Sequence, residues 1–294
     1  MAFARDCATD FGAATAKAAF LVAPDGFARA EQSAGDNQYM AAAEAFDADQ
    51  ASRQHRGLQA ALSSVVPVVC FAGDPEMPDA LFPNNVFGTV PGSLVVGRMR
   101  HPVRQREAAR GDIRAFFADA MGYAQIDLST QPHACELTGA LVIDRARGIG
   151  FCGLSERCDE AGARLMHDAF GLRATLMFDL APGEYHTNVV LAVLAGRTAL
   201  VCPAGFADPA TVEAILGLYA PHGIALSSAE HAAFAGNAIA LSPSVVWMSA
   251  AAAAALSPAT RQSLALAGWE VRDVPLDAIE AAGGSLRCCV GEIF

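Results

Sequence analysis

A thiol, an imidazole and carboxyl or amide groups recur at comparable places along this chain. Each place is the entry to a short apolar segment: Glu136 precedes one such segment, His186 precedes the next, and Cys288 lies in the last predicted strand. Asp79 and Asn85 stand in the same way before an earlier segment. If the segments surround an axis, these side chains converge. A thiol, an imidazole and a carboxylate in one cleft supply a nucleophile, a proton shuttle and an orienting charge.

The adjacent cysteines near the end of the chain have two interpretations. The segment LRCCVGEIF could be a last buried strand whose cysteines are small apolar fillers. Alternatively, Cys288 reacts and Cys289 points to the opposite side, because side chains alternate along a strand. Gly283 and Gly284 would then let the chain turn tightly into the site.

The remaining cysteines predict a cytoplasmic protein with reduced thiols. The eight cysteines show no paired C-x-x-C spacing, and most stand in apolar segments such as VVCFAG and ALVCPAG. Asp6 and Asp10 interrupt the N-terminal segment, where a signal peptide needs a continuous apolar run. No window reaches the roughly 18 apolar residues of a membrane span. We therefore expect neither secretion nor insertion into a membrane.

Size and charge narrow the class of protein further. The chain has 294 residues, of which 53% are hydrophobic and 17% charged, so it can bury a large core and is not a disordered chain. Its formal net charge of -11 argues against nucleic acid as a partner, because phosphates are bound by clustered Lys and Arg. No low-complexity linker divides the chain, so residues 1–294 are expected to form a single catalytic domain.

Short apolar runs occur in pairs separated by turn residues, and each pair predicts two adjacent strands joined by a tight turn. The pairs lie at 86–99, 139–154, 188–203 and 237–250. Amphipathic segments that predict helices lie at 105–122, 160–171, 208–223 and 257–268. The order strand, strand, helix predicts a mixed α/β fold.

The spacing of these pairs predicts a repeat. Their starts, at Val86, Gly139, Asn188 and Asn237, are 53, 49 and 49 residues apart, and a period near fifty indicates repeated supersecondary units. Such units could surround an axis, with reactive residues on loops at one end. An ordinary parallel α/β sheet is the alternative. No glycine-rich phosphate-binding motif follows a strand, so no nucleotide site is indicated.

Five segments together resemble the guanidino-group-modifying enzymes, the amidinotransferase superfamily: LFPNN, CELTGALVID, LSERCDEAG, YHTNV and GGSLRCCVGEIF. The resemblance covers about residues 18–294, and its nearest branches are the dimethylarginine dimethylaminohydrolases and bacterial hydrolases related to arginine deiminase. It implies a five-bladed α/β propeller of ββαβ units around a central active site, which agrees with the repeat. It also implies a reaction without a metal or an organic cofactor.

The resemblance implies catalytic roles for three residues. Cys288 matches the nucleophile, His186 the general acid and base, and Glu136 the acid that grips the guanidinium. A thiolate is a strong nucleophile, and imidazole titrates near neutral pH. The implied reaction is hydrolysis of a C–N bond of arginine or an N-substituted arginine through a covalent thiouronium intermediate, giving citrulline and ammonia or an amine.

The resemblance also implies a substrate pocket. Asp79 and Asn85 match positions that hold the substrate's nitrogens, and Phe82 matches an aromatic wall. Arg104 and Arg157 match arginines that bind an α-carboxylate, for which the guanidinium fork is suited. The expected partner is a small arginine-like molecule, with no nucleic acid and no membrane, and a homodimer is compatible with the resemblance.

Two amides stand where relatives carry carboxylates. Asn85 and Asn188 each remove a negative charge near the substrate nitrogens. This leaves room for an N-substituted arginine, or for a ureido amino acid such as citrulline, in place of arginine itself. An amidinotransferase and a non-catalytic protein that binds an arginine-like metabolite are further alternatives, although the intact Cys, His and Glu set argues against a pure sensor.

Overall fold

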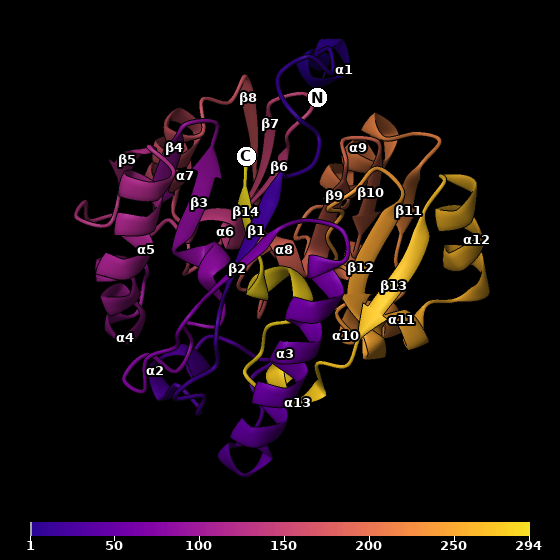
Figure 1. The fold of residues 1–294 in the computed structure, drawn as a ribbon. Coiled ribbons are helices and arrows are strands. Elements are labelled where there is room, and N and C mark those ends of the chain that lie inside the picture. Colours follow the sequence, from indigo (N-terminus) through magenta and orange to yellow (C-terminus); the bar gives the residue numbers. More distant parts are fainter. Residues whose placement is uncertain (1) are drawn as a thin grey trace.

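The structure of the protein, a computed structural model, describes residues 2–294 and contains five small β-sheets (Figure 1). Three sheets that follow one another along the chain share one topology: an antiparallel hairpin and a third strand that is parallel to the hairpin's second strand. Their strands are β3 (Phe87–Val90), β4 (Ser93–Val96) and β5 (Ala124–Asp127); β6 (Leu141–Asp144), β7 (Ile149–Leu154) and β8 (Ala174–Asp179); and β9 (Leu191–Leu194), β10 (Thr198–Val201) and β11 (Gly223–Ala225).

The first sheet joins strands from near both ends of the chain. β1 (Ala18–Val22) is parallel to β2 (Val68–Phe71) and antiparallel to β14 (Gly291–Ile293). In Figure 1 the yellow β14 lies beside the indigo β1 near the centre of the molecule. The last strand thus supplies the antiparallel partner that a hairpin supplies in the other units, and the set of five units is closed.

The fifth sheet is shorter than predicted. It consists of the parallel strands β12 (Val245–Ser249) and β13 (Glu270–Val274). The predicted hairpin partner of β12 is reduced to one antiparallel bridge between Ile239 and Trp247. Pairing stops there because the first N–H of β12 donates to the hydroxyl of Ser242 (3.2 Å) instead of to a neighbouring strand. The five-bladed α/β propeller is nevertheless confirmed, and the alternative of one parallel sheet is wrong.

Helices connect the strands; α5, α9 and α12 lie on the outside of the molecule, whereas the short α6 and α8 lie near its centre (Figure 1). In α7, Asp159 caps the first turn by accepting a hydrogen bond from the backbone of Gly162 (2.7 Å), and the buried positions recur at helical spacing. The helices and helical turns are α1 (Ala2–Asp6), α2 (Glu31–Ala34), η1 (Ala43–Ala45), α3 (Ala48–Ser63), η2 (Pro83–Asn85), α4 (Pro102–Gln105), η3 (Arg106–Ala109), α5 (Gly111–Ala115), η4 (Phe116–Ala120), α6 (Leu137–Ala140), α7 (Glu160–Ala169), α8 (Thr187–Val190), η5 (Pro203–Gly205), α9 (Pro209–Leu218), α10 (Ser228–Ala232), α11 (Ala250–Ala255), α12 (Pro258–Leu266), α13 (Asp277–Glu280) and η6 (Leu286–Cys289).

The helix predicted over 105–122 is divided into shorter segments. The backbone leaves the helical region at Arg110, where φ is -57° and ψ is 97°. The side chain of Arg110 holds this break, because its guanidinium donates to Asp112 (2.8 Å from Nε) and to the carbonyl of Ala72 (2.7 Å). A contact with a distant segment thus overrides the local helical pattern.

Short helical turns precede the hairpins at the positions that carry the predicted site residues. The turns α6 and α8 occupy the starts of the second and third predicted strand pairs, and η2 ends just before the first. As a result, β3, β6 and β9 begin one, two and three residues later than expected. Glu136 and His186 are the residues immediately before α6 and α8, and each accepts the first backbone hydrogen bond of its turn. The chain changes direction there, which directs these side chains toward the centre of the propeller rather than along a sheet.

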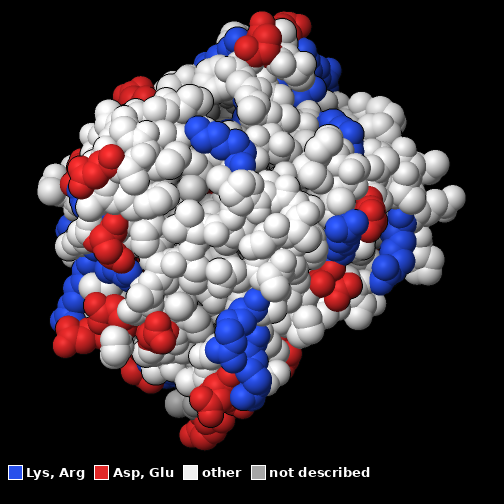
Figure 2. All heavy atoms as spheres, in the orientation of Figure 1, with Lys and Arg blue, Asp and Glu red and all other residues white. Residues whose placement is uncertain are grey.

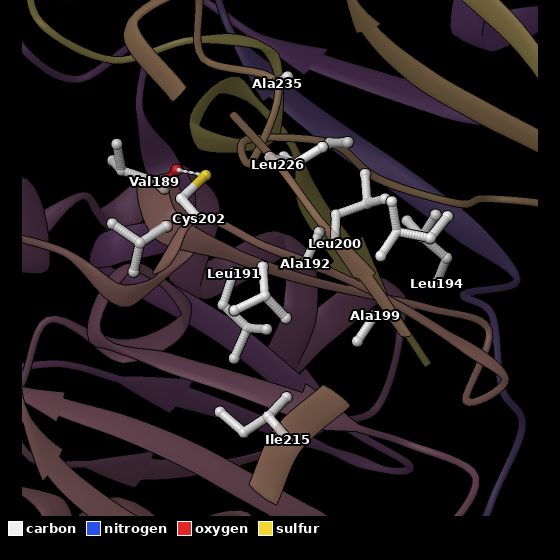
Figure 3. Close-up of a cluster of buried hydrophobic side chains, with 14 of the residues drawn as sticks. Val189, Leu191, Ala192, Leu194, Ala199, Leu200, Cys202, Ile215, Leu226 and Ala235 are labelled. Carbon is white, nitrogen blue, oxygen red and sulfur yellow. Dashed lines mark hydrogen bonds between the residues drawn. The ribbon is translucent and has the colours of Figure 1, made fainter. Parts of the chain in front are cut away.

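The fourth unit is built on a dense apolar core (Figure 3). Side chains on both faces of its sheet are buried: Leu191, Leu194, Ala199 and Leu200 are 1% exposed or less. Cys202 belongs to the same cluster, and its sulfur contacts the carbonyl of Val189, as the dashed line in Figure 3 marks. This cysteine is therefore a packing residue, as the apolar segment around it predicted.

A substitution in this core tests its contribution to stability. We expect Leu200→Ala to lower the free energy of unfolding by about 2–5 kcal/mol, because it removes buried methyl groups and leaves a cavity. Leu266→Ala is the matched control: Leu266 is 76% exposed on α12, so the same change should alter stability by less than about 0.5 kcal/mol. Equal midpoints of the two variants in urea unfolding would contradict the assignment of Leu200 to the core.

Charged side chains lie mainly toward the edges of the face shown in Figure 2, and much of its middle is uncharged. On this face Lys and Arg side chains are interspersed with Asp and Glu, and no extended basic surface is visible. Among the helices of residues 2–294, none combines the length and the apolar character needed to cross a bilayer.

Candidate active site

The turns at the starts of the units meet around a cavity of about 300 Å³, part of which is open to solvent. Its wall includes seven side chains predicted from the sequence: Asp79, Phe82, Asn85, Arg104, Arg157, His186 and Cys288. Ser33, Asn37, Met40, Tyr185, Ala282 and Gly284 complete the wall. The other two predicted residues, Glu136 and Asn188, lie behind it, in hydrogen-bonding contact with His186 and Cys288 respectively. Segments far apart in the sequence thus form a single site.

His186 and Glu136 form a buried pair. The Nε2 atom of His186 lies 2.8 Å from Oε2 of Glu136. Because a carboxylate accepts hydrogen bonds, Nε2 carries the proton of the neutral ring, and Nδ1, which has no partner within residues 2–294, is left to accept one. Burial lowers the pKa of His186 below its ordinary value, although Glu136 opposes the shift. The imidazole is therefore neutral near pH 7 and can act as a base.

Both oxygens of Glu136 are occupied by protein groups. Oε1 accepts from the backbone of Arg100 (3.0 Å), and Oε2 accepts from His186 and from Nη1 of Arg157 (3.3 Å). Burial alone would raise the pKa of Glu136, but Arg157 and His186 hold it well below its usual value. The carboxylate therefore stays ionised. This differs from the expected grip on a guanidinium, because Glu136 is behind the cavity wall and orients His186.

Cys288 lies in the helical turn η6, and the prediction that it lies in the last strand is wrong, since β14 begins only after the turn. The turn resembles those that carry the other site residues and brings the sulfur to the cavity. Nδ2 of Asn237 lies 3.3 Å and Oδ1 of Asn188 3.7 Å from the sulfur. Burial raises the pKa of the thiol, while the hydrogen bond from Asn237 lowers it. The thiol is therefore protonated at neutral pH.

Cys289 packs away from the cavity. It is fully buried in an apolar cluster, and its sulfur contacts the carbonyl of Ser285 at 3.6 Å. The two sulfurs are separated by the geometry of the turn, not by the alternation of a strand. The preceding glycines allow this geometry: Gly283 has a φ of 75°, and a Cβ on Gly284 would lie 3.0 Å from the ring of Phe82.

Asp79 and Asn85 each contribute an oxygen without a partner to the site. Oδ2 of Asp79 accepts from the hydroxyl of Ser33 at 2.6 Å, but its Oδ1 and the Oδ1 of Asn85 are buried with no partner in the described part of the chain. Burial raises the pKa of Asp79, against the effects of Arg104 and Ser33. Buried acceptors without partners cost free energy, so these two atoms mark where the N–H groups of a ligand would bind.

Arg104 is held by a carboxylate that the sequence analysis did not select. Its Nε and Nη2 donate to the two oxygens of Glu107 at 2.8 Å each, and Nη2 also donates to the carbonyls of Asp79 and Phe82 (3.2 Å). Burial raises the pKa of Glu107 to about 7, although Arg104 opposes the shift. These bonds use Nε and Nη2 and leave Nη1 of Arg104 to donate to another group in the cavity.

Arg157 is bound by two carboxylates. Its Nε and Nη2 form a fork with Asp36, its Nη1 donates to Glu136, and Nη2 also donates to the carbonyl of Ser33 (3.2 Å). Burial alone would raise the pKa of Asp36, but Arg157 and His101 lower it below its usual value. Arg157 thus has fewer donors to offer a substrate than Arg104. Through these bonds Arg157 connects Ser33 and Asp36 to Glu136, the partner of His186.

Besides the additional wall residues given above, three residues that hold the side chains of the site were not predicted as site residues: Asn237, Glu107 and Asp36. Asn237 was recognised in the sequence only as the start of a repeat, which was the signal that it faces the axis. Glu107 lies three positions after Arg104, the spacing at which an ion pair forms along a helical turn. Asp36 pairs with Arg157 across 121 positions, and no local pattern indicates this contact. Among residues 2–294, no group of three or more His, Cys, Asp or Glu side chains is arranged to hold a metal ion.

A five-bladed α/β propeller with a cysteine, a histidine and a carboxylate at its centre agrees with the resemblance to the guanidino-group-modifying enzymes. The chain matches the family model described as "N,N dimethylarginine dimethylhydrolase, eukaryotic" over residues 23–294. Because this match covers most of the chain, the protein belongs to that family.

Individual relatives agree with this assignment. The N(G),N(G)-dimethylarginine dimethylaminohydrolase of Mycobacterium tuberculosis (strain ATCC 25618 / H37Rv) is 29% identical over 219 residues, which cover 74% of this chain and 67% of the relative. The substrate-bound N-terminal domain of ArgZ, an arginine dihydrolase from cyanobacteria, has a similar fold, with a TM-score of 0.82, 21% identity and coverage of 94% and 97% of the two chains. A dimethylarginine dimethylaminohydrolase in an adduct with S-methyl-L-thiocitrulline has a similar fold as well, with a TM-score of 0.69 and 18% identity. The match covers 94% of this chain and 99% of that one.

Proposed function

We propose that the protein is a cysteine hydrolase that cleaves a C–N bond at the guanidino carbon of arginine or an N-substituted arginine. The products are citrulline and ammonia or an amine. The observation that carries the proposal is the cavity wall shared by the thiol of Cys288 and the imidazole of His186, with Glu136 holding the imidazole from behind. Membership of the dimethylarginine dimethylhydrolase family supports the same class of reaction.

The balance of charge favours a cationic substrate. Four carboxylates and two guanidinium groups lie in the cavity wall or directly behind it: Asp36, Asp79, Glu107, Glu136, Arg104 and Arg157. With His186 neutral and all four carboxylates ionised, these groups carry a net negative charge. Burial raises the pKa of Asp79 and of Glu107, which favours their protonated forms, and a cation beside them would favour the ionised forms. A guanidinium, which stays protonated at neutral pH, would offset this negative charge, whereas a neutral ureido group would not.

The reaction begins with attack of the sulfur of Cys288 on the guanidino carbon. The N–H groups of the substrate donate to the free oxygens of Asp79 and Asn85, which fixes the plane of the group. As the C–S bond forms, the thiol proton passes to Nδ1 of His186. Glu136 stabilises the imidazolium that results, because its oxygen already accepts from Nε2.

The tetrahedral adduct then breaks down. The imidazolium of His186 returns its proton to the departing amine, the C–N bond breaks, and a thiouronium group remains on Cys288. His186 next removes a proton from water, and the hydroxide attacks the same carbon. Cleavage of the C–S bond releases the ureido product as the proton of the new hydroxyl group passes to the sulfur. The imidazolium of His186 then loses its proton to solvent, which restores the neutral imidazole beside the thiol. Each step uses side chains of the cavity already described.

The decisive experiment is incubation of the purified protein with arginine, N-methylated arginines, agmatine and citrulline, followed by mass analysis of products and protein. We expect turnover of an arginine or N-methylated arginine and a mass increase on the peptide that contains Cys288. Turnover that requires an added amine would instead identify an amidinotransferase. Binding of these compounds without turnover or adduct would overturn the proposal in favour of a metabolite-binding protein.

A second candidate is hydrolysis of a ureido amino acid such as citrulline. The observation that favours it is the set of neutral amides at the site: Asn188 and Asn237 lie against the sulfur of Cys288, and Asn85 lies in the cavity wall. A neutral amide does not select a cation as a carboxylate does. The same panel separates the two candidates. Conversion of citrulline to ornithine with no conversion of arginine would replace the first proposal by the second.

Arg104 gives a prediction about recognition of the α-carboxylate. We expect Arg104→Lys to raise the KM for the amino-acid substrate about 10- to 100-fold with a smaller effect on kcat, because Lys keeps the charge beside Glu107 but lacks the Nη1 donor. Agmatine, which has no carboxylate, is the control substrate, and its kinetics should change less. An equal change for both compounds would exclude a contact between Arg104 and the carboxylate.

A further inference from the structure

One polar residue from each unit lies at the same point of the repeat. Asn85, Thr138, Asn188, Asn237 and Cys288 follow one another at intervals of about fifty residues. All five are buried. We call these five residues the ring. Cys288 is its fifth member, and each of the other four carries an amide or a hydroxyl group.

Side chains of this ring bond to the backbone of the unit before them. Oγ1 of Thr138 donates to the carbonyl of Asn84 (3.1 Å), Nδ2 of Asn188 to the carbonyl of Thr138 (3.1 Å), and Nδ2 of Asn237 to the carbonyl of Asn188 (2.8 Å). The same type of bond thus links four successive units around the axis. At the end of the series stands Asn237, which is fully buried.

The orientation of the Asn237 amide is fixed by its neighbours. Its oxygen accepts a hydrogen bond from the backbone N–H of Arg287 at 2.9 Å, so its nitrogen must be the atom that faces Asn188 and the sulfur of Cys288. That nitrogen has two protons. One donates to the carbonyl of Asn188 at 2.8 Å. The other has two acceptors within reach, the sulfur of Cys288 at 3.3 Å and Oδ1 of Asn188 at 3.4 Å.

Asn188 lies against the same sulfur with the opposite polarity. Because its nitrogen donates to Thr138, its oxygen faces Cys288, at 3.7 Å from the sulfur. The oxygen of Asn188 can accept a hydrogen bond from the thiol but repels a thiolate. The amide of Asn237 can donate to either form and bonds more strongly to the anion. Among these two amides, Asn237 is the one that favours the reactive form of the sulfur.

We propose that Asn237 is a positioning residue that holds the turn of Cys288 through the backbone of Arg287 and stabilises the thiolate by donating a hydrogen bond to its sulfur. The inference rests on the proposed function only in that Cys288 is the nucleophile. It can be tested without a substrate, so failure of the hydrolase proposal and failure of this one are distinguishable.

The test is the pH dependence of alkylation of Cys288 by iodoacetamide, followed by mass analysis of its peptide in a Cys289→Ala background. We expect Asn237→Asp to shift the profile upward by about one to two pH units, because the new carboxylate keeps the bond to Arg287 but has no proton for the sulfur. Asn237→Ser, whose hydroxyl is too short to span both contacts, is the second variant and should shift the profile in the same direction without an added charge.

Thr138→Val is the matched control, because it removes a ring bond of the same type that does not touch the sulfur. It should lower thermal stability and leave the alkylation profile where it is in the parent protein. If the Asn237 variants lose stability but keep the parent profile, Asn237 is a structural residue only and the proposal is wrong. A profile that moves equally in Thr138→Val would also overturn it, because the effect would then belong to the ring as a whole.

Discussion

Replacing Cys288 with serine is expected to lower kcat by at least about 10⁴-fold, the largest effect of any substitution considered for this protein. A serine hydroxyl is a weak nucleophile at neutral pH, and His186 is arranged to accept a thiol proton, not to activate a much less acidic hydroxyl. Substrate binding should persist, since the other members of the cavity wall are unchanged. Steady-state kinetics and equilibrium binding of the preferred substrate together measure both effects.

Cys289→Ala is the control for this prediction, because the neighbouring sulfur is buried in the apolar cluster and contacts the Ser285 carbonyl instead of the cavity. It should retain most of kcat and form the same covalent intermediate as the wild type. An adduct found on Cys289, or turnover by Cys288→Ser close to that of the wild type, would remove Cys288 from the mechanism.

The hairpins were predictable from the sequence because their determinants are local. Alternating apolar residues and turn residues define β3 with β4, β6 with β7, and β9 with β10, and these pairs occur where predicted. The prediction of a hairpin was wrong for the fifth unit, because the hydroxyl of Ser242 accepts a hydrogen bond from the N–H of Val245 that a hairpin would use. Such a contact leaves the apolar pattern unchanged, so the pattern could not indicate it.

The convergence of the site was predictable for a similar reason. Glu136 and His186 lie at equivalent points of successive units, two residues before Thr138 and Asn188. Cys288 is the counterpart of Asn188 two units later, and a closed set of units brings these neighbouring points together. What spacing cannot give is the partner of each side chain. Glu136 serves His186 rather than the cavity because Arg100 and Arg157 occupy its remaining acceptor sites, and these contacts depend on how the loops pack.

Glu136→Gln is expected to lower kcat/KM by about 10²- to 10⁴-fold, although the side chains differ by one group. Glu136 accepts on both sides: Arg100 donates to one oxygen, and His186 and Arg157 donate to the other. A glutamine has one oxygen and one NH₂ group. In one orientation the NH₂ group faces the N–H of Arg100, and in the other it faces the N–H groups of His186 and Arg157, so a donor always faces a donor. If the NH₂ group faces His186, Nε2 must become the acceptor. The proton then moves to Nδ1, which can no longer receive the thiol proton.

The pH profile separates this effect from a loss of stability. Burial lowers the pKa of His186 while Glu136 raises it, so the acidic limb of kcat/KM should lie below pH 6.5 in the wild type and lower still in Glu136→Gln. Glu107→Gln is the matched control, because burial raises the pKa of Glu107 to about 7 and its partner is Arg104, not His186. If Glu107→Gln removes the acidic limb and Glu136→Gln leaves it in place, the titrating group is Glu107, and the assignment of His186 as the general base is wrong.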